Sequence, residues 1–252
     1  MEIISSRSNP KIKYACSLKK ASGDAAYVLA EGLRLCEDAA QNGVEIDSCF
    51  VSEKLADSLQ VQSILRKSAH TYMVEEHVCE KLSDTKHPQG IFCICKKPAL
   101  DTKPDYQGKY LFLENISDPG NFGTIVRTAE AFGLSGILAA GGCDPFAPKV
   151  MRASMGAVFR FPVIAVQDSV AFLNECKQNG MRLFCSVVSG EAKDVSVLAG
   201  KQGVITAVGN EANGLSDALI ACGTPITIPM AGRAESFNAA QAATVMMYEM
   251  SK

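Results

Sequence analysis

The chain has 252 residues, of which 47% are apolar and 21% are charged, and its formal net charge is −2. This composition excludes a disordered protein, and the length suffices for one large domain or two small ones. The slightly negative total gives no overall attraction to nucleic acid, so an RNA-binding site would need local clusters of positive charge.

Ten cysteines are spread along the chain without a C-x-x-C pair, and all three histidines, His70, His77 and His87, lie before residue 90. This pattern predicts reduced, mostly buried thiols in a cytoplasmic protein and no metal site. The first residues, "MEIISSRSNPKIK", lack the apolar region of a signal peptide, and no apolar run approaches the roughly 20 residues of a membrane span. We therefore expect a soluble protein without a membrane partner.

The first twenty residues are locally basic, with five basic side chains against the single acid Glu2. The candidates for RNA contact are Arg7, Lys11 and Lys13. Two interpretations stay open, because such a cluster forms either a solvated surface or an arm that contacts RNA phosphates.

The rest of the first hundred residues predicts a small α/β unit. "YVLAEGLRLCEDAAQNG", residues 27–43, has apolar residues at helical spacing and a stop signal at its final Asn-Gly. Short strands are predicted at "SCFVS", "TYMVE" and "IFCICKK". The following lysine- and proline-containing stretch indicates a linker. The predicted domains are residues 1–98 and 106–252, with a linker at 99–105.

The second part of the chain predicts an α/β fold, with a mostly parallel sheet and helices on both faces. Apolar strand-like runs alternate with helical patterns such as "FGTIVRTAEAF" and "VAFLNECKQNG". The predicted strands are "YLFLEN", "SGILAAGG", "FRFPVIAV", "RLFCSVV", "GVITAVG" and "TPITIPM". Ligands of such sheets bind beyond the carboxyl ends of the strands. That rule selects the loops after "FLEN", "ITAVG" and "ITIPM".

In the first of these loops, Asn121 is expected to cap a helix that runs to Phe132 and stops at Gly133. The buried face of this helix is predicted from the helical spacing of Phe122, Ile125, Val126 and Ala129.

Arg127 lies outside that apolar stripe, and its side chain should lean back over Gly123. The arginine and the helix N-terminus would then favour an anionic ligand such as phosphate. Spacing alone leaves open the alternative of a surface ion pair between Arg127 and Glu130 or Asp118.

The other two loops carry weaker signals. In "AVGNEANGLS", Gly209 and Gly214 permit tight turns, Glu211 would need a partner if buried, and Ser216 is expected to cap the next helix. In the third loop a strand is predicted to end at Pro229, and an alanine-rich helix is predicted to begin near Ser236. Ser236 and Asn238 are readily interpreted as helix caps.

Neither a G-x-G-x-x-G nor a G-x-x-x-x-G-K-[ST] pattern occurs in these loops, which disfavours dinucleotide and P-loop sites. No histidine lies in the second part to activate a serine nucleophile.

Together the loops resemble the three motifs of a known family. They read "N-x-x-D-P-x-N-x-G-x-x-x-R-T-A" at residues 115–129, "G-N-E-x-x-G-L-S" at 209–216 and "I-P-M-x-G-x-x-x-S-x-N" at 228–238. The chain resembles SpoU-type (TrmH-like) RNA 2′-O-ribose methyltransferases of the SPOUT superfamily, and "DPFAPKVMRASMGAVFRFPV" at 144–163 is similar to them as well. The N-terminal part resembles the small RNA substrate-binding domain often attached to these enzymes.

This resemblance implies a deep trefoil knot at the C-terminus, S-adenosylmethionine as the cofactor, RNA as the partner and a homodimer. It implies that Gly209, Ile228, Met230 and Phe237 line the cofactor pocket. Phe237 departs from the leucine common among relatives, which is a packing change.

The resemblance also implies a catalytic set: Arg127, Asn121, Glu211, Ser236 and Asn238. Arg127 would bind RNA phosphate and help to deprotonate the 2′-hydroxyl. Its high pKa, above about 12, makes free arginine a poor base, so positioning or electrostatic stabilisation is the physically safer role.

Ribosomal RNA is favoured over transfer RNA because the N-terminal part resembles that of ribosomal RNA enzymes. A non-catalytic RNA-binding or ribosome-assembly factor on the same scaffold stays open, although the full set of polar motif residues argues against it. A nucleotide-dependent oxidoreductase lacks its phosphate-binding fingerprint.

Overall fold

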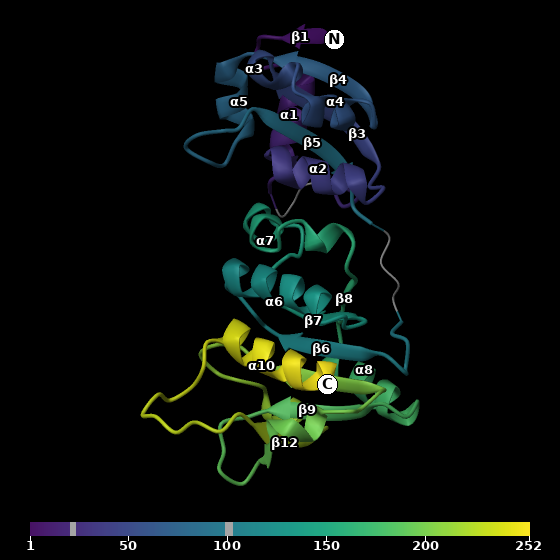
Figure 1. Ribbon diagram of the computed structural model, residues 1–252, viewed down its shortest axis with the longest axis vertical. Coiled ribbons are helices and arrows are strands. Elements are labelled where there is room, and N and C mark those ends of the chain that lie inside the picture. The colour runs from purple at the N-terminus through teal and green to yellow at the C-terminus, as the bar shows by residue number, and fades with distance from the viewer. Residues whose placement is uncertain (21–23, 99–102) are drawn as a thin grey trace. The chain divides into compact units, whose positions relative to one another are not determined.

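The computed structural model describes residues 1–20, 24–98 and 103–252 (Figure 1). The chain forms two compact units: Met1–Ala99 with Phe146–Arg160, and Leu100–Pro145 with Phe161–Lys252. Residues 99–102 of the predicted linker lie outside the described residues. The segment Phe146–Arg160, expected in the second domain, groups with the first unit, where helix α7 (Pro148–Ala153) contacts strand β2 (Tyr27–Glu31).

A five-stranded sheet in the order β1-β4-β3-β5-β2 forms the centre of the first unit. Strands β1, β4 and β3 are parallel, and β5 is antiparallel to β3 and β2. The further elements of this unit are β1 (Glu2–Ile4), α1 (Pro10–Ser17), α2 (Leu33–Gln41), β3 (Ile46–Ser52), α3 (Glu53–Ala56), α4 (Leu59–Leu65), β4 (Ser68–Val74), α5 (Glu76–Leu82), β5 (Ile91–Lys96) and the short 3-10 helix η1 (Ala157–Phe159). The three strands predicted here are confirmed as β3, β4 and β5.

The helix predicted over residues 27–43 is wrong in its first part. Residues Tyr27–Glu31 form β2, which pairs with β5, and only Leu33–Gln41 is helical. Gly32 separates the two elements with a φ of 95°, a conformation that glycine adopts readily. The apolar run of β2 is buried on both faces, and such a run fits a helix or a strand equally well. The stop signal is confirmed, because Gly43 follows α2 with a φ of 74°.

The second unit is built on a seven-stranded sheet in the order β10-β12-β9-β11-β6-β7-β8, and all described pairings are parallel. Its elements are β6 (Lys109–Glu114), α6 (Pro119–Ala131), β7 (Gly136–Ala140), β8 (Val163–Ala165), α8 (Ser169–Gln178), β9 (Arg182–Ser186), β10 (Lys193–Asp194), η2 (Val195–Leu198), β11 (Val204–Val208), α9 (Asp217–Ile220), β12 (Thr224–Thr227) and α10 (Ala239–Ser251). The predicted α/β class and its six strands are confirmed, with β10 as an addition and β12 ending two residues before Pro229.

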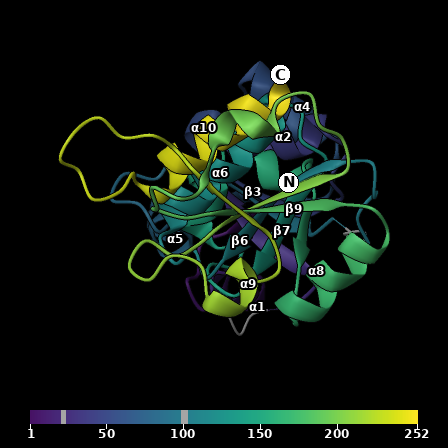
Figure 2. The same cartoon turned by 90° about the horizontal axis from the view of Figure 1, so that it is seen from below.

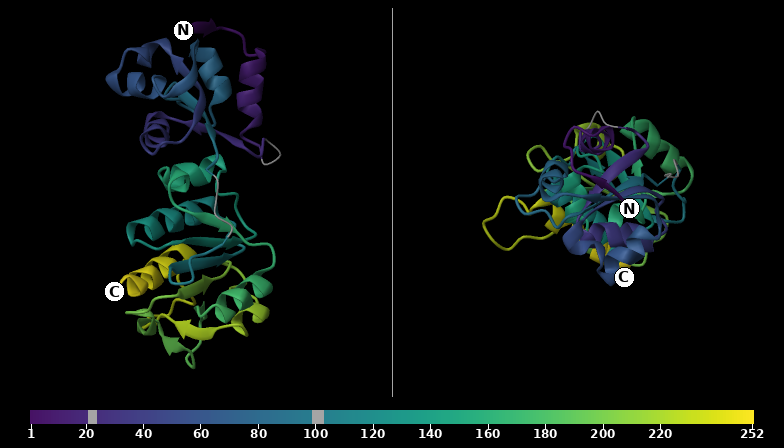
Figure 3. Two further views of the ribbon diagram at one scale, coloured as in Figure 1. Left: turned by 90° about the vertical axis from the view of Figure 1, so that its right-hand side faces the viewer. Right: turned by 90° about the horizontal axis from the view of Figure 1, so that it is seen from above.

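Helices cover both faces of this sheet, as Figures 2 and 3 show. On one face, Phe112 and Ile205 pack with Leu173 of α8 and Leu219 of α9 in a single apolar core. On the other face, α10 packs against α6 and also contacts β11 and β6. Successive residues of a strand point to opposite faces, so the continuous apolar strands of this unit fill both cores.

All ten cysteines have free thiols, and seven of them are buried, as the composition predicted. Burial raises the pKa of Cys79 and of Cys185 to about 11, so these thiols stay protonated and serve as apolar core groups. None of the helices in the described part of the chain is long and apolar enough to cross a membrane.

Candidate active site

Three motif-bearing loops leave the same edge of the second sheet, because all its strands are parallel. The loop after β6 leads into α6, the loop after β11 leads into α9, and the loop after β12 leads into α10. Strand β11 lies directly between β6 and β9, and β9 separates it from β12. The loops selected from the sequence therefore meet at the carboxyl ends of neighbouring strands, where ligands of parallel sheets bind.

Helix α6 begins earlier than predicted, and Asn121 is not its cap. The cap is Asp118, whose side chain accepts a hydrogen bond from the backbone N–H of Asn121 at 2.7 Å. Pro119 occupies the first helical position, where its fixed φ and missing N–H are favourable. Because Asp118 caps the helix, the side-chain amide of Asn121 is available for other contacts. The buried face is as predicted, and Gly133 follows the helix with a φ of 68°.

The freed amide of Asn121 joins all three loops. Its Nδ2 donates to Oε1 of Glu211 at 2.7 Å, and its Oδ1 accepts from Nδ2 of Asn238 at 3.1 Å. We call these residues the three-residue network. Glu211 is exposed, so Asn121 orients its carboxylate at the surface and does not compensate for burial.

Asn238 also caps helix α10, as its sequence position suggested. Its Oδ1 accepts hydrogen bonds from the backbone N–H groups of Ala240 and Gln241 at 2.9 and 3.3 Å. The helix begins at Ala239, so Ser236 lies outside it and does not cap it. One asparagine thus fixes the start of α10 and the orientation of Asn121. The oxygen of its side-chain amide accepts the two capping bonds, and the nitrogen donates to Asn121.

Arg127 is exposed on α6 and is separate from the network. Within residues 1–20, 24–98 and 103–252, its side chain has no hydrogen bond or ion pair. The alternative of a surface ion pair with Glu130 or Asp118 is therefore not found. Gly123, one turn earlier, belongs to the buried face of the helix. The guanidinium remains available to an anion.

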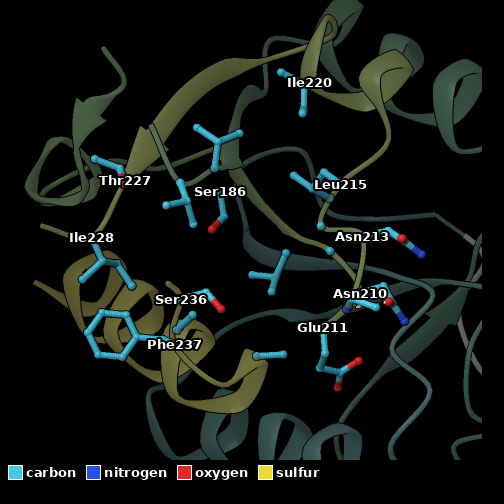
Figure 4. A pocket seen from close by; sticks show the side chains of 18 of the residues that line it. Ser186, Asn210, Glu211, Asn213, Leu215, Ile220, Thr227, Ile228, Ser236 and Phe237 are labelled. Carbon is cyan, nitrogen blue, oxygen red and sulfur yellow. Dashed lines mark hydrogen bonds between the residues drawn. The ribbon is translucent and has the colours of Figure 1, made fainter. Parts of the chain in front are cut away.

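A cavity of about 380 Å³ lies beside the network. All four residues predicted for the cofactor line it: Gly209, Ile228, Met230 and Phe237. Glu211 and Ser236 line it too. Figure 4 shows Phe237 and Ile228 on one side of the cavity and Glu211, Asn210 and Asn213 on the other. A volume of this order and a mixed apolar and polar wall are typical of small-molecule sites.

Glycine is required at position 209 by close packing of the backbone. A Cβ atom there would lie 2.1 Å from the carbonyl carbon of Gly214. The loop between β11 and α9 therefore folds tightly on itself at the point where Gly209 lines the cavity.

Two polar residues that the sequence interpretation missed also line the cavity. Ser186 and Thr227 stand at the carboxyl ends of β9 and β12. The rule on strand ends could have found Ser186, because "RLFCSVV" was recognised as a strand and only its following loop was omitted.

Ser216 stands at the N-cap position of α9 but makes no capping bond with its side chain, so the predicted role is wrong. Its hydroxyl donates to Glu114 at 2.8 Å, and its backbone N–H donates to the same carboxylate at 2.7 Å. The hydroxyl bonds to Glu114 and not to the helix end, because a charged carboxylate is a stronger acceptor than a neutral group.

Two of the three predicted RNA-binding side chains near the N-terminus have acidic partners. Arg7 lies 2.8 Å from Glu80, and Lys11 lies 2.9 Å from Glu2. The hydrogen bond to Glu2 raises the pKa of Lys11 above its usual value. Lys13 is exposed and has no such contact among the described residues. Within the same described residues, no group of three or more metal-ligating side chains is placed to hold a metal ion.

Comparison with known proteins identifies the family. Residues 108–248 match the SpoU rRNA Methylase family, and residues 9–93 match the MRM3-like substrate binding domain. This chain belongs to the SpoU rRNA methylase family. The resemblance to SpoU-type methyltransferases is thereby confirmed.

Similar proteins cover nearly the whole chain. An uncharacterised tRNA/rRNA methyltransferase of Synechocystis is 33% identical over 98% of this chain and 92% of its own length. The 23S rRNA (guanosine(2553)-2′-O)-methyltransferase RlmP of Bacillus subtilis is 29% identical over 99% of both chains. The crystal structure of an AdoMet-bound rRNA methyltransferase from Sinorhizobium meliloti has a TM-score of 0.86 and 29% identity, and covers 99% of this chain and 97% of its own.

Proposed function

We propose that this chain transfers a methyl group from S-adenosylmethionine to a ribose 2′-hydroxyl of ribosomal RNA. The observation that carries the proposal is the three-residue network beside the cavity, in a member of the SpoU family. The network links one residue from each of the three motif loops, so a single arrangement orients these three loops beside the cavity.

The cavity fits S-adenosylmethionine in size and in chemistry. Gly209, Ile228, Met230 and Phe237 would hold the cofactor, with apolar side chains against its base and the main chain of Gly209 against its polar groups. When bound, the cofactor supplies an electrophilic methyl group on a sulfonium. Ser186 and Thr227 offer hydroxyls at the strand ends for its polar groups.

The protein's own contribution to the reaction is positioning and electrostatics. Arg127 binds an RNA phosphate beside the target ribose, because its guanidinium is exposed and has no acidic partner in the described residues. The same positive charge stabilises negative charge that develops on the 2′-oxygen. Asn121 holds Glu211 in one orientation, and Ser236 places a hydroxyl on the cavity wall. Together these groups would align the ribose with the cofactor.

Ribosomal RNA is proposed over transfer RNA because of the N-terminal unit. That unit matches a substrate-binding domain, and RlmP, named for a 23S rRNA nucleotide, aligns with the chain over both parts. We further propose residues 1–98 as this RNA-binding domain, 99–105 as a linker and 106–252 as a knotted methyltransferase domain. The matches over residues 9–93 and 108–248 support these boundaries.

We also propose that the chain is cytoplasmic and forms a homodimer. Helices α6 and α10 lie side by side, and their ends carry Phe132 and Tyr248 with ring centroids 6.1 Å apart. Tyr248 is 51% exposed, which leaves an aromatic group on this face for a second copy of the chain.

The test is to incubate the protein with labelled S-adenosylmethionine and separate ribosomal and transfer RNAs, and then to map the modified nucleotide. We expect label on one ribose of ribosomal RNA that resists alkaline cleavage at that position. Label on transfer RNA would show that transfer RNA, and not ribosomal RNA, is the substrate. Cofactor binding without transfer to either RNA would favour a non-catalytic ribosome-assembly factor.

A further inference from the structure

The loop between β11 and α9, residues 209–216, carries Glu211 and forms one wall of the cavity. We call it the cavity loop. Its central residues, Glu211 to Gly214, are exposed, and Leu215 is its only member buried in the core. An exposed segment with few buried contacts opens easily unless hydrogen bonds hold it. The position of Glu211 therefore depends on how this loop is attached.

Hydrogen bonds within the loop give it a defined shape. The backbone N–H of Asn210 donates to the carbonyl of Gly214 at 3.1 Å, and the return bond measures 2.8 Å. Oδ1 of Asn210 accepts from the backbone N–H of Ala212 at 2.9 Å. These bonds close the loop on itself but do not connect it to the rest of the sheet.

The connection is made at the end of β6. Both oxygens of the Glu114 carboxylate are used: Oε2 accepts the backbone N–H of Ser216 at 2.7 Å, and Oε1 accepts its hydroxyl at 2.8 Å. Glu114 is half-buried, and hydrogen bonds to a carboxylate are stronger than those between neutral groups. This residue fixes the end of the loop nearest α9.

The next residue of the chain fixes the other end. The carbonyl oxygen of Asn115 accepts from Nδ2 of Asn210 at 2.9 Å. Asn115 has a φ of 55°, an uncommon conformation for a residue other than glycine. Its own backbone N–H donates to Ala140 of β7 at 2.8 Å, which ties this conformation to the neighbouring strand. Two consecutive residues of β6 and its loop thus bind both ends of the cavity loop.

We propose that Glu114 is a positioning residue, which clamps the cavity loop against β6 and so sets both the cavity wall and the place of Glu211. It touches neither the cavity nor the three-residue network, and it acts through Ser216. The clamp itself follows from the contacts, and its effect on methyl transfer rests on the proposed function.

The test compares Glu114→Ala with Glu114→Gln. Alanine removes both hydrogen bonds to Ser216. Glutamine keeps two, because its oxygen accepts the backbone N–H and its nitrogen donates to the hydroxyl oxygen. The control is Asp168→Ala, which removes a carboxylate bond to the backbone N–H of Ala171 at the start of α8. Ser216→Ala keeps the backbone bond and provides a milder variant if Glu114→Ala does not fold.

The first measurement is hydrogen exchange of the free protein, which needs neither cofactor nor RNA. We expect the amides of the cavity loop to exchange about tenfold faster in Glu114→Ala, while those of β11 keep their protection. Glu114→Gln should stay within about threefold of the wild type, and Asp168→Ala should leave the loop unchanged. Unchanged exchange in both Glu114→Ala and Ser216→Ala would overturn the proposal.

The second measurement is calorimetric titration with S-adenosylmethionine. Glu114→Ala should weaken its binding about tenfold, with near-full rescue in Glu114→Gln. Equal loss in the two variants would mean that the charge matters and the bonding pattern does not, and the proposed role would be wrong. A wild-type protein that methylates no RNA would refute the proposed function alone, because exchange and binding still decide the role of Glu114.

Discussion

Two basic side chains of the first unit, Arg7 and Lys11, lie against acidic neighbours, whereas Arg127 of the second unit has no acidic partner among the described residues. Arg7 and Lys11 form ion pairs of 2.8 and 2.9 Å. Exposed ion pairs contribute little to stability, about 0 to 1 kcal/mol, but an anion that binds such a cation must compete with its partner. An unpaired guanidinium is free to bind phosphate without that competition. The two regions therefore differ in which charges are available to RNA.

Acids show the same difference. Glu80 and Glu2 in the first unit accept bonds from cations, while Glu211 in the second unit accepts its bond from the neutral amide of Asn121. A neutral donor orients a carboxylate without cancelling its charge. We infer that the second unit keeps the charge of Arg127 available to an anion, and a cation of this kind stabilises negative charge that develops in a transition state.

The largest effect is expected from Arg127→Ala. Transfer to RNA should fall about 100- to 1,000-fold, the usual loss on removing a group that stabilises a developing oxyanion. Affinity for S-adenosylmethionine should stay unchanged, because Arg127 does not line the cavity. Single-turnover kinetics and calorimetry measure the two quantities.

Arg182→Ala is the matched control for that experiment. Arg182 is also exposed in the second unit, but it stands at the amino end of β9. Its loss should change neither quantity. A fully active Arg127→Ala variant would refute the role of Arg127 and remove the contrast between the two regions.

The next effect is expected from Asn121→Asp, which separates the two bonds of this residue. Aspartate still accepts from Asn238 but cannot donate to Glu211 when ionised, and it places a second carboxylate beside the first. Transfer should fall about tenfold or more. Repulsion between the two carboxylates raises the pKa of one of them. As the pH falls through that raised pKa, the protonated carboxyl group gains an O–H that donates a hydrogen bond to the other carboxylate.

The check is a pH profile of the ratio between the variant and the wild type. We expect this ratio to rise toward low pH. A ratio that is independent of pH would show that the bond to Glu211 does not matter, and the neutral donor would lose its assigned function.

A smaller effect, on stability, is expected from Asp118→Ala. Loss of the helix cap should lower the free energy of unfolding by about 1 kcal/mol, within a range of 0.5 to 2 kcal/mol. The control is Asp168→Ala, which removes the equivalent cap of α8 at 3.0 Å. Chemical denaturation should give similar losses for both variants.

Activity should distinguish the two caps, because only α6 carries Asn121 in its first turn. Asp118→Ala should reduce methyl transfer several-fold, and Asp168→Ala should not. Equal activity in the two variants would mean that the cap of α6 is a purely structural feature.

Much of the fold was predictable because its strands are long apolar runs. "YLFLEN" and "GVITAVG" are short apolar runs that alternate with helical patterns and are buried on both faces, as central strands of a parallel sheet are. The same property caused the error at residues 27–43, where an apolar run buried on both faces fits the period of a helix and that of a strand equally well. The helix cap was misassigned because Asp118 and Asn121 are both good caps, and only Pro119 at the first helical position distinguishes them.

The site was predictable as a set of loops, but its connections were not. Asn121 and Glu211 are 90 residues apart, and Asn121 and Asn238 are 117 residues apart. No local spacing encodes such pairs, because the order of strands in the sheet brings them together. The same holds for Glu114 and Ser216, 102 residues apart. Sequence patterns identified which residues carry chemistry, and the sheet determined which of them meet.

The smallest effect concerns the basic residues near the N-terminus. Lys13 is exposed and unpaired in the described structure, whereas Arg7 is held by Glu80 and by the carbonyl of His77. If Lys13 contacts one RNA phosphate, Lys13→Ala should weaken binding of a ribosomal RNA fragment a few-fold. It should also lower the slope of log K against log salt by about 0.7 to 0.9.

Arg7→Ala should change that slope less, because the guanidinium must first leave Glu80 to reach a phosphate. Lys54→Ala provides the charge-matched control, since Lys54 is paired with Glu76 at 3.1 Å and both side chains are largely exposed. Binding measured at several salt concentrations separates these cases. Equal slopes for Lys13→Ala and Arg7→Ala would show that surface ion pairs do not withhold charge from RNA. Competition by acidic neighbours would then fail to explain the contrast between the two units. Arg127 would differ from the basic residues near the N-terminus only in its position on α6.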